Sequence, residues 1–175
     1  MDNISIKIID IEHASDINIK NEPFQLFGRM IPSYQDGKWG YQITHNEYLE
    51  LDCFPDENYD YEQMKENYVF LGAYDDSKCI GLAIMEHQWN KYMYLYDLKV
   101  NSSYRGQHIG KQLIEACYSY AKEQNYLGMW TVGQDNNLGT CLFYLSNGFR
   151  IGGLNTESYK GTKQEGKADI YFFKD

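Results

Sequence analysis

The chain of 175 residues carries a formal net charge of -9 at pH 7. This length suits one domain with one hydrophobic core, so we expect a single domain over residues 1–175. The acidic balance argues against a broad nucleic-acid-binding surface. No stretch is apolar for long enough to span a bilayer. The first residues also lack the pattern of a signal peptide, and we therefore expect a cytoplasmic protein that binds neither nucleic acid nor membrane.

The N-terminal part of the chain predicts a strand followed by a hairpin. Ile4–Ile9 is a short apolar run, and Asp10–Ile19 is polar and ambiguous, compatible with a helical turn. Further along, Asp36-Gly37 separates two runs rich in aromatic and apolar residues, which extend over 23–34 and 39–43. Asp-Gly between such runs is a hairpin signal. We therefore expect an extended hairpin in this part of the chain.

An acidic stretch follows the predicted hairpin. Over residues 47–66 it holds eight carboxylates against the single cation of Lys65. Such runs are usually a solvated face, here of a helix and a loop, with a helix over Tyr59–Asn67. Clustered carboxylates can also concentrate a cationic substrate. The sequence leaves these two interpretations balanced.

The second half of the chain alternates strands and helices. Tyr68–Tyr74, Cys79–Gln88 and Tyr92–Val100 are strand-like and joined by short turns, so they should pair antiparallel. Helical periodicity then covers Ile109–Glu123. A strand over Leu127–Val132 should return parallel to the strand before that helix. The remaining expected elements are a helix over Leu138–Ser146 and strands over Phe149–Gly152 and Ala168–Phe173, separated by a polar loop.

The turn between residues 100 and 109 has the properties of an anion site. A strand runs into a glycine-bearing turn, and the turn opens a helix, so several backbone N–H groups should converge near the positive end of the helix dipole. No acid occurs from Leu98 to Ile114, whereas Lys99, Arg105 and Lys111 do. A phosphate is the natural ligand of such a turn. The alternative is an ordinary turn with solvated cations.

The residues Arg105-Gly106-Gln107-His108-Ile109-Gly110 resemble the acyl-CoA signature of the GNAT superfamily of N-acetyltransferases, Arg/Gln-x-x-Gly-x-Gly/Ala. The resemblance implies acetyl-CoA as cosubstrate and no metal. By the match, the loop as far as Lys111 binds the pyrophosphate, and the strand Leu98-Lys99-Val100 lies along the pantetheine arm. His108 departs from the pattern, because the first motif glycine usually stands there. Histidine nevertheless tolerates positive φ better than most residues.

The order of the expected elements from Tyr68 onward matches the GNAT core. The resemblance therefore implies an α+β fold with a central, mixed and mostly antiparallel sheet flanked by helices. In that family helices commonly occupy the region where the hairpin is expected here. The hairpin would then be an N-terminal elaboration of the fold.

A second motif agrees with the first. The stretch from Asn137 to Phe149 resembles the family pattern Asn-x-x-Ala-x-x-Phe/Leu-Tyr-x-x-x-Gly-Phe. By this match Asn137 contacts the pantetheine or pyrophosphate, and Tyr144 points at the CoA sulfur. A phenol with a pKa of about 10 can protonate a thiolate whose thiol has a pKa of about 8.5. The structural alternative is that Tyr144 only packs with Phe143 and Phe149.

The attacking amine must lose a proton, and Asp97 is the leading candidate to assist. Simple alternation places Tyr92, Tyr94 and Tyr96 on one face of the strand and Asp97 on the other, with Met93 and Leu95. A carboxylate on an apolar face needs a partner, which a substrate ammonium would provide. Asp97 could act as a base or only as an anchor. Glu86 in the neighbouring strand is a weaker candidate.

Matches outside these motifs narrow the resemblance to streptothricin acetyltransferases. They are Glu22-Pro23-Phe24, Ile31-Pro32-x-Tyr34, Trp39, Trp89-Asn90-x-Tyr92 and Gln134-Asp135-Asn136-Asn137. The resemblance implies acetylation of an amine of the β-lysine moiety of streptothricin, a small cationic molecule, by direct attack in a ternary complex. The acceptor-site candidates are Tyr34, Trp89, Tyr96 and Tyr159, besides Asp97.

Other functions remain open at the level of sequence. The acceptor could be a polyamine, an aminoglycoside or a protein amine. A non-catalytic acyl-CoA sensor is less favoured, because both Asp97 and Tyr144 are present. The sequence does not decide between a monomer and a homodimer.

Overall fold

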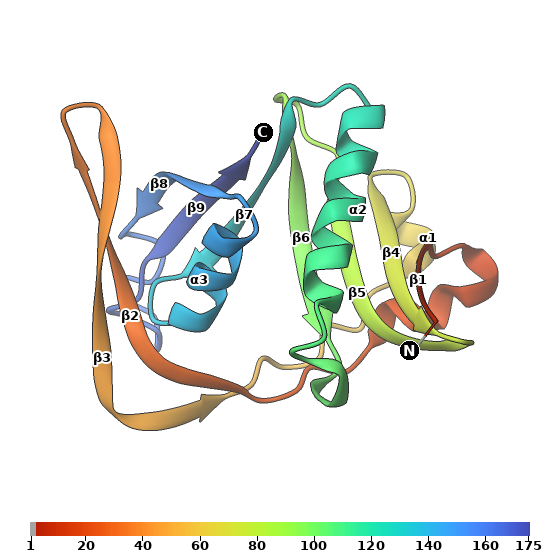
Figure 1. The fold of residues 1–175 in the computed structure, drawn as a ribbon, viewed down its shortest axis with the longest axis horizontal. Coiled ribbons are helices and arrows are strands. Elements are labelled where there is room, and N and C mark those ends of the chain that lie inside the picture. Colours follow the sequence, from red (N-terminus) through yellow and green to blue (C-terminus); the bar gives the residue numbers. More distant parts are fainter. Residues whose placement is uncertain (1–2) are drawn as a thin grey trace. The chain divides into compact units, whose positions relative to one another are not determined.

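A computed structural model describes residues 3–175 (Figure 1). Its contacts divide the chain into two compact units. Unit 1 comprises Met1–Glu22 and Cys53–Met129, and unit 2 comprises Pro23–Asp52 and Trp130–Asp175. Each unit combines strands and helices, which confirms the predicted α+β class. That the whole chain forms one domain stays a prediction.

The sheet of unit 1 is an antiparallel meander preceded by one N-terminal strand. Its strands follow the order β1-β4-β5-β6 and pair antiparallel throughout, with bounds β1 (Ile4–Ile8), β4 (Tyr68–Asp75), β5 (Lys78–Glu86) and β6 (Tyr92–Val100). The three-stranded meander expected from the short turns is therefore confirmed. It brings β6, and the turn that follows it, to one side of the unit 1 strands.

Helices cover both faces of this sheet. The helices of unit 1 are η1 (Ile11–Asn18), α1 (Tyr61–Met64), η2 (Ser102–Tyr104) and α2 (Ile109–Glu123). The longest of them, α2, packs on the face of Gly81, where the Leu113 side chain approaches closely. The opposite face carries a cluster in which Ile17 of η1 packs with Leu82 and Ile84. No helix within residues 3–175 has the length and apolar character that a membrane crossing requires.

A β-bulge in β6 changes which side chains share a face. Ile84 lies opposite Asp97, but the next residue, Met85, lies opposite Leu95. Tyr96 is therefore an extra residue, and the alternation of faces is interrupted there. Because residues opposite each other share a face, Asp97 lies with Ile84 on the η1 side rather than with Leu95. The expectation from simple alternation was wrong for this residue.

Unit 2 contains the predicted hairpin, formed by β2 (Phe24–Gln35) and β3 (Lys38–Asp52). Its turn residues Asp36 and Gly37 have φ of 51° and 76°, the left-handed conformations of a type I′ turn. The register shifts between Leu26 and Gly28, and residues 46–49 of β3 lie in that irregular region. The first part of the acidic stretch therefore lies in a strand, not in a helix or loop.

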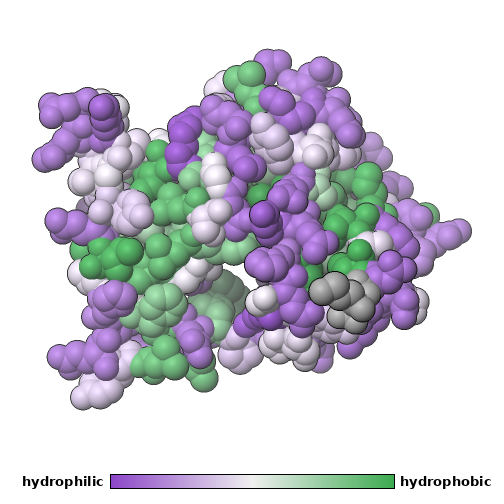
Figure 2. All heavy atoms as spheres, viewed as in Figure 1, coloured by the Kyte–Doolittle hydropathy of each residue, from purple (hydrophilic) through white to green (hydrophobic). Residues whose placement is uncertain are grey.

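The rest of unit 2 is built on strands and one apolar helix. Its elements are β7 (Gly128–Gln134), which begins in unit 1, α3 (Leu138–Ser146), β8 (Arg150–Asn155) and β9 (Asp169–Lys174). The strand order is β7-β9-β8, and β8 pairs antiparallel with β9. Gly28 is required in β2, since a Cβ there would overlap the backbone oxygen of Thr44 in β3 and would also lie 2.7 Å from Leu138 Cδ2 of α3. In the space-filling view, hydrophobic side chains gather at the surface over α3 (Figure 2).

Candidate functional site

The turn after β6 has the backbone conformation of an anion-binding loop. Gly106 has φ +77°, and a Cβ there would meet no heavy atom within 4 Å. His108 has φ 62° and ψ 13°, and its side chain makes no capping hydrogen bond to α2. The first N–H groups of this 15-residue helix therefore have no side-chain cap at His108. His108 thus adopts the positive φ that the motif glycine would supply, and binding of a pyrophosphate by this turn stays a prediction.

Side chains hold this turn in place. Glu22 accepts hydrogen bonds from Ser102 N at 2.6 Å and Ser102 Oγ at 2.7 Å. These bonds stabilise the carboxylate and lower the pKa of Glu22. Arg105 Nε donates to Val100 O at 3.1 Å. The structural role of Glu22 was missed by sequence reasoning, which noted this residue only as part of a family match.

Asp97 lies in a partly buried network of charged and phenolic groups. Asp97 Oδ2 accepts a hydrogen bond from Tyr59 OH at 3.0 Å and lies 3.1 Å from Lys99 Nζ. The same Nζ lies 3.0 Å from Glu57 Oε2. Burial raises the pKa of Asp97, and the nearby Lys99 ammonium opposes that rise without cancelling it. Sequence reasoning missed Glu57 and Tyr59, because they come from an irregular loop far away in the chain.

The network has an unbalanced charge when its carboxylates are ionised. It then holds two carboxylates, Asp97 and Glu57, and one ammonium, Lys99. The side chains of Asp97 and Lys99 are only 16% and 10% exposed, so water screens this excess negative charge poorly. A second cation would balance it. The network is therefore suited to hold the ammonium group of a ligand.

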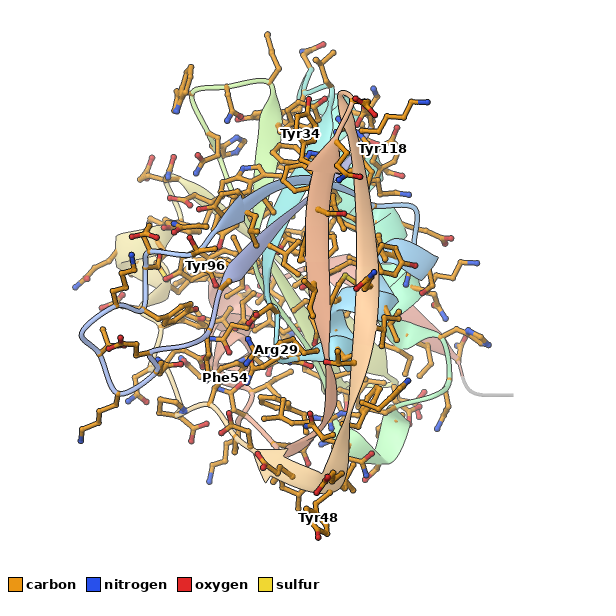
Figure 3. All side chains as sticks on the ribbon, turned by 90° about the vertical axis from the view of Figure 1, so that its left-hand side faces the viewer. Arg29, Tyr34, Tyr48, Phe54, Tyr96 and Tyr118 are labelled. Carbon is orange, nitrogen blue, oxygen red and sulfur yellow. The ribbon has the colours of Figure 1, made fainter. Side chains whose placement is uncertain are left out.

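Tyrosine rings adjoin the network. The Tyr96 ring lies 6.0 Å from the Tyr59 ring and 5.3 Å from the Tyr68 ring. Tyr96 is 42% exposed, so a ligand can reach its ring. Figure 3 labels this side chain. Aromatic faces attract cations, and these tyrosines add to the attraction of the carboxylates.

Two other candidates of unit 1 lie outside this network. Glu86, the weaker candidate base, accepts hydrogen bonds from Tyr68 OH at 2.9 Å and Gln88 Nε2 at 3.0 Å, so it already has donors. Trp89 is 94% exposed, in the loop between β5 and β6. It lines a pocket of about 280 Å³ with residues 87–91 and 124–126. No residue of the Asp97 network lines that pocket.

In unit 2, Asn137 begins α3 at the end of a polar segment. Its Oδ1 accepts a hydrogen bond from Thr140 N at 3.2 Å, which caps the helix. The neighbouring Asn136 Oδ1 is buried and has no hydrogen-bond partner among residues 3–175. A buried acceptor of this kind calls for a donor from a ligand or a water molecule. This observation favours a binding role for the segment to which Asn137 belongs.

Asp135 anchors the same segment, a role that sequence reasoning did not identify. Its carboxylate pairs with Arg29 and accepts a hydrogen bond from Ala168 N at 2.9 Å. Its backbone oxygen accepts a hydrogen bond from Met30 N at 2.9 Å. Figure 3 labels Arg29 beside the hairpin strands. Asp135 therefore ties β2 and the segment before β9 to the residues that precede α3.

Tyr144 lies in an aromatic cluster of unit 2. It is 7% exposed, and its ring lies 5.3 Å from Phe149 and 5.4 Å from Phe172. The ring of Phe143 lies 5.7 Å away. These contacts fix the position of the phenol ring. They agree with the packing role considered from the sequence and do not test whether the hydroxyl donates a proton.

The other two acceptor candidates differ in their surroundings. Tyr34 is 60% exposed near the hairpin turn, with its ring 5.0 Å from that of Trp39. Tyr159 OH donates to Asp169 Oδ1 at 2.7 Å and accepts a hydrogen bond from Gln134 Nε2 at 2.9 Å. Burial raises the pKa of Tyr159, so its hydroxyl stays protonated. Their contact with an acceptor stays a prediction.

This chain is similar to known acetyltransferases. The model of the Acetyltransferase (GNAT) family matches residues 38–149. Streptothricin acetyltransferase A of Bacillus subtilis (strain 168) is 31% identical over 92% of this chain and 94% of its own length. Streptothricin acetyltransferase of Escherichia coli is 23% identical over 88% of this chain and 77% of its own length.

Solved structures share the fold. A Bacillus anthracis (strain Ames) protein assigned as a streptothricin acetyltransferase, crystallised with acetyl coenzyme A, has a TM-score of 0.85 and 25% identity to this chain. The match covers 98% of this chain and 96% of that one. A nourseothricin acetyltransferase has a TM-score of 0.80 at 19% identity, covering 98% and 97% of the two chains.

Proposed function

Because this chain belongs to the GNAT family and is an acetyl-CoA-dependent N-acetyltransferase, we propose that its acceptor is an amine of the β-lysine moiety of streptothricin. The observation that carries the proposal is the network around Asp97, whose excess negative charge and adjoining tyrosines suit an ammonium group. The names of the Bacillus subtilis and Escherichia coli relatives support the choice of streptothricin. The modified antibiotic would lose one positive charge.

The residues from Leu98 to Lys111 bind acetyl-CoA in this proposal. The first N–H groups of α2 hold the pyrophosphate together with the backbone of the Arg105–Lys111 loop. Main-chain groups of Leu98 and Val100 hold the pantetheine arm. Open space beside Gly106, where a Cβ would meet no atom, supports a close approach of the phosphates to the loop. Acetyl-CoA supplies the thioester, and Asn137 adds a polar contact to the pantetheine or the pyrophosphate.

Asp97 acts on the acceptor in a direct transfer within a ternary complex. Its carboxylate first pairs with the ammonium and takes one proton from it, and the neutral amine nitrogen then attacks the acetyl carbonyl carbon. A raised pKa makes Asp97 a better base than an ordinary aspartate. The tyrosines beside it, Tyr96 above all, orient the aliphatic part of the acceptor. Tyr34, Trp89 and Tyr159 are proposed as further acceptor contacts.

Tyr144 serves the leaving group. Once the C–N bond has formed, the C–S bond breaks, and the Tyr144 hydroxyl gives its proton to the departing sulfur. The nitrogen then loses its second proton, which restores the phenol and leaves a neutral amide. The packing of its ring against Phe149 and Phe172 would keep the hydroxyl oriented. A covalent relay through Cys117 or Cys141 is disfavoured, since burial raises the pKa of Cys141 to about 12 and also raises that of Cys117.

The direct test is acetyl transfer from acetyl-CoA to streptothricin by the purified protein, with the modified nitrogen located by mass spectrometry or NMR. We expect one acetyl group on a β-lysine amine. A panel containing a polyamine, an aminoglycoside and a lysine peptide serves as the comparison. A higher kcat/KM for any of these amines than for streptothricin would overturn the proposed acceptor while leaving the family assignment intact.

A further inference from the structure

The strand β3 has one edge that no other strand covers. β2 and β3 form a sheet of two strands, and nothing else within residues 3–175 pairs with β3. The outer edge of β2 is partly covered, because Met30 N donates to Asp135 O and Gly28 forms a bridge with Asn137. The uncovered edge of this hairpin therefore belongs to β3.

Over residues 39–45 this edge lacks the devices that usually prevent strands from pairing. Residues 39–45 contain no acidic residue, lysine, arginine or proline. Tyr41 is 46% exposed and Ile43 37% exposed, although both are large and apolar. Exposed edges of this kind normally carry charges, proline or bulges, or are covered by another strand. We propose that a second copy of this chain covers it, so that two β3 strands pair antiparallel in a homodimer.

The two ends of β3 have complementary shapes. A pocket of about 530 Å³ lies at the beginning of the strand, lined by Trp39, Tyr41, Leu145, Phe149 and Ile151, with the cations of Lys38 and Arg150. At the other end, the register shift leaves residues 46–49 outside the regular pairing with β2. There Tyr48 is 78% exposed and Leu49 58% exposed. Figure 3 shows Tyr48 and Tyr34 labelled at opposite ends of the hairpin.

The charges at the two ends are also complementary. Lys38 stands at the start of β3, whereas Glu47 and Glu50 stand near its end. An antiparallel pair sets the start of one strand beside the end of the other, so each lysine meets acids. A parallel pair would instead place acids beside acids. The two-fold arrangement is thus favoured by the strand's own charge distribution.

An antiparallel pair of β3 strands centred on Gln42 matches both the shapes and the charges of the two strand ends. It places Trp39 opposite the partner's His45 and Tyr41 opposite the partner's Ile43, an aromatic residue against a β-branched one. Lys38 then lies opposite the partner's Asn46, next to the partner's Glu47. The exposed Tyr48 and Leu49 of each copy would fill the apolar pocket of the other.

A charge exchange tests this interface. Sedimentation equilibrium of the full chain should show a dimer. Lys38→Glu and Glu47→Lys should each weaken it at least about tenfold, which corresponds to ~1.4 kcal/mol. The double variant should recover most of the lost affinity, because the exchanged charges again attract each other. Lys163→Glu, in the exposed loop before β9, should leave the dimer unchanged.

Hydrogen exchange gives a second, independent measurement. Amides of residues 39–45 that point away from β2 should exchange more slowly at concentrations where the dimer dominates than after dilution. A protein that sediments as a monomer at all concentrations would overturn the proposal. Binding of a different protein to this edge would not rescue it. A dimer that both single variants leave intact, or whose β3 amides show no protection, would overturn it equally.

Discussion

Lys99 shows how one side chain can set the properties of the proposed base. Its ammonium lies within 3.1 Å of both Asp97 and Glu57 and is 10% exposed. Removing a single partner from a buried ion pair leaves an uncompensated charge, which costs more than the pair contributes. Lys99 therefore compensates one of the two neighbouring carboxylates when both are ionised, and the remaining negative charge is left for a ligand.

The ionisation of Asp97 should appear in the stability of the protein. Burial raises its pKa in the folded state, so the folded protein binds this proton more readily than the unfolded chain. The ionised form consequently costs stability at pH values above the folded pKa, and the cost disappears as the pH falls through that pKa. Asp97→Asn removes this titration. We expect the variant to gain stability relative to the natural protein as the pH rises from acid to neutral.

Denaturant unfolding of both proteins over a series of pH values measures this difference. Asp76→Asn, in the turn between β4 and β5, is the matched control and should track the natural protein. A stability difference that does not vary with pH would show that the attraction of Lys99 cancels the effect of burial on the pKa of Asp97. A change in the opposite direction would show that the attraction of Lys99 outweighs burial.

The hydroxyl of Tyr144 can be removed without disturbing the aromatic packing. Tyr144→Phe keeps the ring between Phe149 and Phe172, so the fold and the affinity for acetyl-CoA should be unchanged. If the hydroxyl protonates the sulfur, kcat should fall about 10²-fold or more, as for other general acids. Stopped-flow assays and calorimetry with acetyl-CoA separate the two quantities. Unchanged turnover would reduce Tyr144 to a packing residue.

At the scale of elements, regular periodicity was sufficient to predict helices and the hairpin from the sequence, whereas irregular features could not be predicted. The helices over Ile109–Glu123 and Leu138–Ser146 have the predicted bounds, because their apolar spacing and the turn residues around them are unambiguous. The hairpin turn at Asp36-Gly37 was also predicted correctly. The bulge at Tyr96 could not be predicted, since a strand of alternating residues contains no signal for one extra residue. That bulge decides on which face Asp97 lies.

The turn before α2 offers a test at this scale. Gly106→Ala introduces a Cβ at φ +77°, which should cost about 1 kcal/mol or more of stability through backbone strain alone. The same Cβ would project toward the proposed phosphates, so we expect acetyl-CoA affinity to fall about tenfold or more. His108→Gly relieves a non-glycine residue at φ 62° and should bind acetyl-CoA about as well as the natural protein.

Calorimetry measures the acetyl-CoA affinity of both variants, and denaturant unfolding measures their stability. A large loss of affinity in His108→Gly would show that the imidazole itself contacts the ligand. Unchanged affinity in Gly106→Ala would argue against close approach of the phosphates to this turn.

At the scale of the molecule, the contacts that complete the candidate site come from distant parts of the sequence. Tyr59 reaches Asp97 across 38 positions, and Arg29 reaches Asp135 across 106. Tyr59 stands in an irregular loop and Arg29 in a hairpin strand, and neither stretch carries a signal for its distant partner, so a single sequence cannot indicate these pairs. The motifs identified which strand and which turn to consider. The fold determined which side chains accompany them.

The acidic stretch over residues 47–66 has a divided role in the structure. Asp56 accepts a hydrogen bond from Asn21 N at 2.9 Å, Asp60 caps α1, and Glu57 pairs with Lys99. Asp56 and Asp60 are therefore structural, and Glu57 belongs to the network around Asp97. Glu50, Glu62 and Glu66 are exposed and remain able to attract a cationic acceptor from solution. The exposed carboxylates alone can therefore decide whether the stretch is a solvated surface or attracts a cationic substrate.

Changing Glu50, Glu62 and Glu66 to glutamine removes three negative charges and leaves the structural acids in place. If the exposed carboxylates steer the acceptor, KM for a polycationic substrate should rise about three- to tenfold at low ionic strength, with kcat unchanged. The difference should vanish in high salt, because the Debye length falls to about 3 Å at 1 M. Glu115→Gln, Glu123→Gln and Glu165→Gln together form a control with the same net charge. An equal rise in KM for the control would assign steering to the overall charge of the molecule, and no rise in either would make the stretch a solvated surface.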